Sequence, residues 1–141
     1  GIALEGMRLV KENLTAVYDD PANLTGRAHM MSAAMMGATA FQKGLGAIHA
    51  LSHPIGAIYH THHGTTNAVV MQAVMRFNRS EIEDRFVAAA RYFGIEGGFD
   101  GFYDFVGGLV THLNIPKNLT TNVYDLSVEI RLKKKYTIKK I

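Results

Sequence analysis

Histidine is the residue type in this chain whose number and spacing could support chemistry. Five of the seven histidines fall between positions 49 and 63, at His49, His53, His60, His62 and His63. Imidazole is a common ligand of divalent transition metals and titrates near neutral pH, so such a cluster is a candidate metal or proton-transfer site. A satisfied polar cluster or a surface patch of histidines is the alternative, and composition alone leaves both open.

The spacing of three of these histidines suits a metal cage. His49 and His53 are four residues apart, which on a helix puts both rings on one face, one turn apart. His63 follows a short polar loop, just before a new apolar-periodic segment. A metal held by neutral ring nitrogens acts as a Lewis acid and lowers the pKa of a bound alcohol or water. Helical ligands, one ligand from a loop and commonly a carboxylate would complete such a site.

Two hydrolytic functions lose support at the same residues. His49 and His53 enclose Ala-Leu-Ser, so the glutamate that serves as base in the zinc-protease motif is absent. Ser52 has histidines nearby but no Gly-x-Ser-x-Gly turn around it, which argues against a serine hydrolase.

The elements that must position these residues are helices. Apolar residues recur at helical spacing along most of the chain, and no alternating pattern of useful length precedes the C-terminal tail. The fold class is therefore predicted to be all-α. Ser80 and Glu83 form a candidate capping box at the start of one helix, and Pro54 should kink another. We expect helices at about 2–18, 25–43, around His49 as far as Tyr59, 65–77, 80–93, 102–113 and 123–132.

The predicted helix at 25–43 is apolar nearly all round, and we expect it to be buried. Its four methionines could suggest a metal or cofactor site, but adaptable core packing is the preferred interpretation. His29, near the start of this helix, is expected to be a half-exposed polar residue. The methionines are Met30, Met31, Met35 and Met36.

Composition indicates one globular domain. The 141 residues are 48% hydrophobic and 19% charged. The net charge of +3 is unevenly placed, because residues 131–141 hold six of the fifteen Lys and Arg and no acidic residue. Residues 1–130 therefore carry nine basic and twelve acidic residues, and the charge gives no reason to expect a nucleic-acid partner. We expect a helical domain at 1–130 and a basic tail at 131–141. A solvated charge run is the default interpretation of this tail, and a basic interaction tail or a truncated or altered reading frame are the alternatives.

The sequence also bears on location. It has no cysteine, which fits a reducing compartment and excludes a thiolate metal site. No apolar run approaches the roughly 18 residues of a membrane helix, and no signal pattern opens the chain. We expect a soluble, cytoplasmic protein with no membrane partner. The chain starts without Met, and apolar residues already recur at helical spacing from its first residues. We therefore expect it to be a fragment of a longer protein.

A longer motif surrounds the histidines. Gly44-Leu45-Gly46 is followed by His49, by His53-Pro54-Ile55-Gly56, by His63-Gly64 and by Asn67-Ala68, and the motif ends at Phe77-Asn78. This order and spacing closely resemble the signature of the iron-containing (group III) alcohol dehydrogenases. The helices before the motif and Ile-Pro-Lys-Asn-Leu after it are similar to the C-terminal domain of the same family. The resemblance covers roughly residues 2 to 130.

The resemblance implies a fold and a set of site residues. The fold is the helical C-terminal half of the dehydroquinate synthase-like architecture, without the N-terminal α/β domain that binds the dinucleotide. The family holds a divalent metal, iron or alternatively zinc, with one Asp and three histidines. His49 and His63 match the last two of these ligands, and the other two belong to a helix upstream of this chain. His53 matches a non-ligand histidine near the nicotinamide, which implies a catalytic role in the proton path and a role in cofactor binding.

The implied activity is hydride transfer between a primary or secondary alcohol or aldehyde and NAD or NADP. Intact members are expected to be homo-oligomers, dimers or larger, and this chain alone is expected to be inactive. A non-catalytic helical metal-binding module and a sister activity, maleylacetate reductase or glycerol dehydrogenase, are the alternatives. His62 stands where the family usually has Pro, and His60 adds another imidazole. Surrogate ligands are one interpretation of these two residues, and loop histidines that face solvent are the preferred one.

Overall fold

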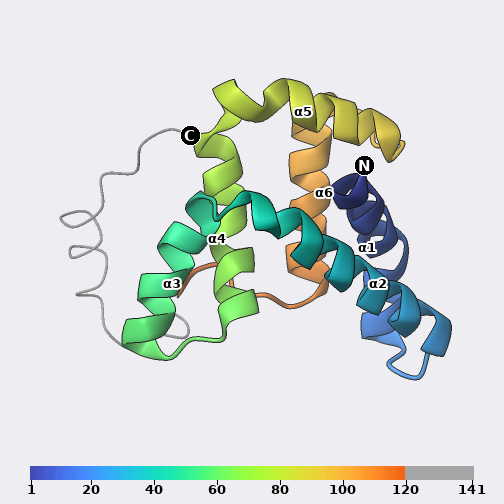
Figure 1. Ribbon diagram of the computed structural model, residues 1–141, viewed down its shortest axis with the longest axis horizontal. Coiled ribbons are helices and arrows are strands. Elements are labelled where there is room, and N and C mark those ends of the chain that lie inside the picture. Colours follow the sequence, from blue (N-terminus) through green and yellow to red (C-terminus); the bar gives the residue numbers. More distant parts are fainter. Residues whose placement is uncertain (120–141) are drawn as a thin grey trace.

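A computed structural model of the chain describes residues 1–119, in which every secondary-structure element is a helix and there is no strand (Figure 1). The all-α prediction is therefore confirmed. The predicted helix at 123–132 and the basic tail at 131–141 lie outside the described residues. The elements are α1 (Ile2–Asp19), α2 (Leu24–Ala40), the 3-10 helix η1 (Phe41–Lys43), α3 (Ala47–Tyr59), α4 (His63–Phe77), α5 (Arg79–Tyr92) and α6 (Gly98–His112).

The helices pack as three consecutive pairs, α1 with α2, α3 with α4 and α5 with α6. Helix α4 also contacts α5 and α6, so it joins the histidine-bearing pair to the rest of the molecule. Figure 1 shows α6 between α4 and α1, with α5 across one end of this layer. The position of α4 therefore decides where His63 lies.

An aromatic core holds α4, α5 and α6 together. The ring of Phe86 meets that of Phe102 edge to face at a centroid distance of 5.1 Å. Burying a side chain of this size contributes about 1.5–3 kcal/mol, and such aromatic pairs add to it. The buried members of this core are Met75, Ala89, Ala90, Phe93, Phe99, Phe102 and Val106. Because Met75 lies on α4, the core fixes that helix relative to α5 and α6.

The predicted capping box at the start of α5 is wrong. The helix begins at Arg79 after the N-cap residue Asn78, and no side chain caps it, so Ser80 lies inside the first turn. Glu83 instead accepts a hydrogen bond from the Arg79 guanidinium at 2.9 Å. The same guanidinium donates to both carboxylate oxygens of Asp100 on α6, at 2.8 and 2.9 Å, and thereby ties the two helices together.

Helix α2 is largely exposed, which contradicts the prediction of a buried helix. The side chains of Leu24, Met31 and Met35 are 77%, 75% and 65% exposed. The contact of α2 with α1 runs through small residues, among them buried Gly6 and Ala33. A Cβ added at Gly6 would lie 3.4 Å from the Ala33 carbonyl oxygen, so the two backbones already touch. A contact of this kind covers only a narrow stripe of the helix.

The assignment of the four methionines to the core fails for the same reason. Met31 and Met35 face outward, while Met30 and Met36 are only partly buried. His29 is exposed, and its Nδ1 lies 3.0 Å from Asn13 Oδ1 on α1. A helix with apolar residues on all its faces is buried only when other elements surround it. In the described part of the chain, α2 has one main neighbour.

The end of α1 is attached to the end of α6 by a small polar cluster. His112 Nε2 lies 2.8 Å from Asp19 Oδ1, and its ring packs edge-on against Tyr18. Asn114 donates to the Tyr18 hydroxyl at 3.1 Å. Within residues 1–119, no helix combines the length and the hydrophobicity needed to cross a bilayer.

Candidate metal centre

Helix α3 supplies two of the three histidines that converge. It begins at Ala47, directly after Gly46, and carries His49 and His53 one turn apart. Their ring centroids are 5.4 Å apart. Pro54 lies inside the helix as predicted and has no N–H to donate to the preceding turn.

The turn between α3 and α4 places the third histidine. His60 ends α3 in the left-handed conformation, with φ of 53°, and donates its N–H to the Gly56 carbonyl at 2.9 Å. His62 is the N-cap of α4, and its Nδ1 accepts a hydrogen bond from the Thr65 N–H at 3.3 Å. Helix α4 therefore starts at His63, two residues earlier than predicted.

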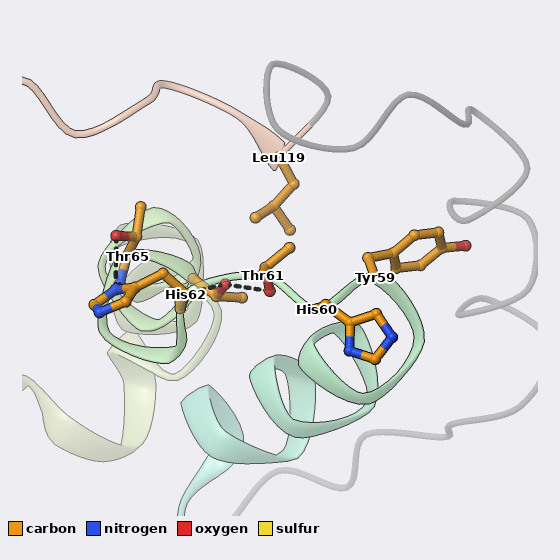
Figure 2. Close-up of a pocket in the computed structure, with 7 residues that line it drawn as sticks. Tyr59, His60, Thr61, His62, Thr65 and Leu119 are labelled. Carbon is orange, nitrogen blue, oxygen red and sulfur yellow. Dashed lines mark hydrogen bonds between the residues drawn. The ribbon is translucent and has the colours of Figure 1, made fainter.

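A pair of threonines closes the same turn. The hydroxyl of Thr66, which is 1% exposed, donates to Thr61 Oγ1 at 2.7 Å and also contacts the His62 carbonyl oxygen at 3.0 Å. Figure 2 shows the surface pocket at this turn, with the ring of His60 on the α3 side and the ring of His62 on the α4 side. Both rings are exposed, and neither belongs to the converging group. This agrees with solvent-facing loop histidines rather than surrogate ligands.

The structure brings His49, His53 and His63 together. One ring nitrogen from each residue lies within 4.8 Å of the corresponding nitrogens of the other two. The ring of His63 is 5.2 Å from that of His49 and 5.4 Å from that of His53, measured between centroids. His49 is partly buried, whereas His53 and His63 are exposed. His53 therefore lies about as close to the two predicted ligands as they lie to each other.

Asn67 completes the group, although the sequence predicts no role for it. Its Nδ2 lies 3.1 Å from His63 Nε2 and 3.5 Å from His49 Nε2, so one side-chain amide bridges the two predicted ligands. Its Oδ1 is buried and has no hydrogen-bond partner. The signal that could have found it is spacing, since Asn67 follows His63 by four positions on α4 as His53 follows His49 on α3.

Burial sets the protonation state of His49. Removal from solvent lowers its pKa below the usual 6.5, and repulsion from His63 and His53 when they are protonated lowers the pKa further. The ring of Phe41 contributes to this burial, at a centroid distance of 4.9 Å. A neutral imidazole is the form that binds metal, so the environment of His49 favours the ligating state near pH 7.

The donor set fits a transition metal. A zinc–nitrogen bond of about 2.1 Å in a tetrahedral site places two ligand nitrogens about 3.4 Å apart. Small rotations of exposed rings would bring nitrogens now within 4.8 Å to that separation. Imidazoles suit iron, zinc, copper or nickel better than magnesium or calcium. In residues 1–119, no carboxylate belongs to the group, and the unpartnered Asn67 Oδ1 is an oxygen already at its edge.

Comparison with known proteins identifies the family. The model described as "Fe-containing alcohol dehydrogenase family, C-terminal" matches residues 1–129. The chain belongs to this family. Its fold is that of the family's helical C-terminal domain, since it superposes on an iron-containing alcohol dehydrogenase from Corynebacterium glutamicum with a TM-score of 0.78 and 25% identity. That match covers 99% of this chain and 41% of the other.

The relatives are oxidoreductases by name. A 4-hydroxybutyrate dehydrogenase from Cupriavidus necator is 39% identical over 128 residues, which are 84% of this chain and 33% of that protein. A methanol:N,N-dimethyl-4-nitrosoaniline oxidoreductase from Amycolatopsis methanolica is 40% identical over 97 residues, or 68% of this chain and 23% of that protein. The chain thus spans a third or less of the length of these relatives.

Proposed function

We propose that this chain is the metal-binding helical part of an alcohol dehydrogenase that transfers hydride between an alcohol or aldehyde and NAD or NADP. His49 and His63 hold the divalent metal, Fe²⁺ or alternatively Zn²⁺. The observation that supports this most directly is the convergence of their ring nitrogens from α3 and α4. The remaining ligands, an Asp and a His, are expected from the part of the relatives that this chain does not span.

The metal supplies Lewis-acid polarisation of the substrate oxygen when it is bound. His53 serves beside it in the proton path and in placing the nicotinamide. Its ring is exposed on the same helix face as His49, so it can face a cofactor that approaches from solvent. An imidazole titrates near neutral pH and can pass a proton between an alcohol and water.

The relatives' names support a proposal for the substrate class. 4-Hydroxybutyrate, methanol and 1,3-propanediol, the last from a 32% identical dehydrogenase of Citrobacter freundii, are all primary alcohols of short chain length. We propose a short primary alcohol, or its aldehyde, as substrate, and a homo-oligomer as the intact form. We also propose that residues 1–130 form one helical domain and that the protein is cytosolic.

A chimera tests this function. Residues 1–129 would replace the matched third of the Cupriavidus necator relative, and the product would be assayed with 4-hydroxybutyrate and NAD in the presence of Fe²⁺ or Zn²⁺. We expect NADH formation that falls at least about 100-fold in His49→Ala and His63→Ala chimeras, because each loses a metal ligand. A His29→Ala chimera is the matched control, since His29 lies outside the converging group.

A folded, metal-loaded chimera without turnover would contradict the dehydrogenase assignment. It would favour the second candidate, a non-catalytic helical metal-binding module. The observation behind that alternative is that, within residues 1–119, the three converging imidazoles all come from one helical pair.

A further inference from the structure

Two pairs of polar side chains face each other across α3 and α4. His49 and His53 are one turn apart on α3, and His63 and Asn67 are one turn apart on α4. The Asn67 amide nitrogen reaches Nε2 of both His63 and His49, at 3.1 and 3.5 Å. These are the two rings to which the proposed function assigns the metal.

The amide and a cation compete for the same lone pairs. A neutral imidazole has one nitrogen with a free lone pair, and Nε2 offers it in both rings as they are hydrogen-bonded here. A cation that binds both Nε2 atoms must therefore break both hydrogen bonds from Asn67. The Asn67 Nδ2 cannot remain where it is, because its hydrogens would point at a positive charge.

The other end of the same amide supplies what the cation needs. Asn67 Oδ1 is buried without a hydrogen-bond partner, so only the nitrogen end of the amide is satisfied. A half-turn about the terminal bond of the side chain exchanges Oδ1 with Nδ2. The carbonyl oxygen then lies beside the two Nε2 atoms, where it can bind a cation or accept a hydrogen bond from water on that cation.

We propose that Asn67 is a third member of the metal site, whose amide turns on metal binding so that Oδ1 faces the cation. In the metal-free state its Nδ2 holds the His49 and His63 rings toward a common point, and in the loaded state its Oδ1 adds an oxygen to their two nitrogens. This inference rests on the proposed metal site, and it assigns an oxygen donor from within the described chain. His53 keeps its place on the cofactor side.

Metal affinity of Asn67 variants tests the proposal. The chain would be titrated with Co²⁺, followed by its visible absorption, and then competed with Zn²⁺. Asn67→Leu keeps the size of the side chain but removes the oxygen, and we expect it to weaken binding about 10-fold and to alter the cobalt spectrum. Asn67→Asp replaces the amide with a charged oxygen donor, and we expect it to tighten binding about 10-fold at pH 7.

Asn13→Leu is the matched control. Asn13 also contacts a histidine ring, that of His29 at 3.0 Å, but on α1 and outside the converging group. Its variant should bind cobalt as the unaltered chain does. Circular dichroism checks that each variant is folded, and if Asn67→Leu does not fold, the Asp variant alone decides.

Three results would overturn the proposal. An Asn67→Leu chain that binds cobalt as tightly as the unaltered chain, or more tightly, would show that Asn67 only hydrogen-bonds the His49 and His63 rings and does not contribute to metal binding. An Asn67→Asp chain with unchanged affinity would equally exclude an oxygen at the cation. If the unaltered chain bound no cobalt, the proposed two-histidine site would fail together with this inference. If the unaltered chain binds cobalt and the Asn67 substitutions do not change its affinity, only this inference fails.

Discussion

His49 has a different environment from the other two histidines of the group. It is partly buried and packs against Phe41, whereas His53 and His63 are exposed. Burial lowers its pKa below 6.5. The folded state therefore holds His49 neutral at a pH where the unfolded chain already binds a proton.

This difference predicts a pH dependence of stability. The unfolded state binds more protons than the folded state between the lowered pKa of His49 and 6.5, so the unfolding free energy falls as the pH decreases through that range. Below the lowered pKa the loss is complete and constant. Urea unfolding of the metal-free chain at about pH 7.5 and 5.5 measures it. Between these two pH values, we expect the unfolding free energy of the His49→Asn chain to fall by less than that of the unaltered chain. That of a chain with His29→Asn, at an exposed position, should fall by as much as that of the unaltered chain. Equal slopes in all three chains would exclude His49 as the cause.

At the residue scale, the sequence predicted the converging histidines but not their amide partner. His49 and His63 were assigned from spacing and motif, and the structure places them side by side. Asn67 is part of the motif, but its role depends on which side chains lie next to it in space. The sequence alone does not show these neighbours. His62 departs from the motif in the sequence, and in the structure its ring caps the N-terminus of α4.

At the scale of elements, the start and the packing of α6 depend on its close contact with the preceding turn. The turn from α5 uses Gly94, Gly97 and Gly98 at positive φ, which lets α6 begin at Gly98, about one turn earlier than predicted. Gly101 then packs against the backbone. A Cβ there would collide with the Glu96 carbonyl oxygen and lie 2.8 Å from its carbonyl carbon.

Two glycine substitutions on this helix should have opposite effects. Gly101→Ala forces backbone against backbone, and we expect it to lower the unfolding free energy by more than about 2 kcal/mol. Gly108→Ala meets nothing within 4 Å, so the better helix former should raise stability by about 0.5–1 kcal/mol. Chemical denaturation of both variants measures the difference. A Gly101→Ala chain as stable as the Gly108→Ala chain would contradict the close packing described for α6.

Helix positions were predictable from periodicity, but the surroundings of a helix were not. The bounds of α1 agree with the prediction to within a residue, since apolar spacing and Asp19-Asp20-Pro21 define it locally. The burial of α2 could not be predicted in the same way. Its composition permits burial on every side, while the described chain covers only the stripe that touches α1 through Gly6 and Ala33.

At the scale of the whole molecule, the described chain leaves apolar surface open at two places. One is the outer face of α2 with Leu24, Met31 and Met35. The other is a cavity of about 450 Å³ between α1, α4 and α6, lined almost wholly by apolar side chains, among them Met71 and Leu109. Both features suit a chain that spans a third or less of the relatives it matches.

The chain by itself should show no dehydrogenase turnover. Residues 1–119 contain no strand from which a dinucleotide-binding sheet could be built, and the proposed cage draws half of its ligands from outside this chain. We expect no NADH formation above a no-protein blank with NAD, 4-hydroxybutyrate and added Fe²⁺ or Zn²⁺. The chimera described above serves as the positive control. Substantial turnover by the isolated chain would show that the site is complete without the rest of the family's architecture.

His49 and His63 should bind the same cation. Nitrogen NMR of the imidazole rings during a Zn²⁺ titration tests it most directly, because metal binding shifts the ligating nitrogen of each ring separately. We expect Nε2 of His49 and Nε2 of His63 to shift together and to saturate at one equivalent of zinc, while the rings of His29 and His112 do not respond. Zinc shifts confined to His60 and His62, or different midpoints for His49 and His63, would contradict it.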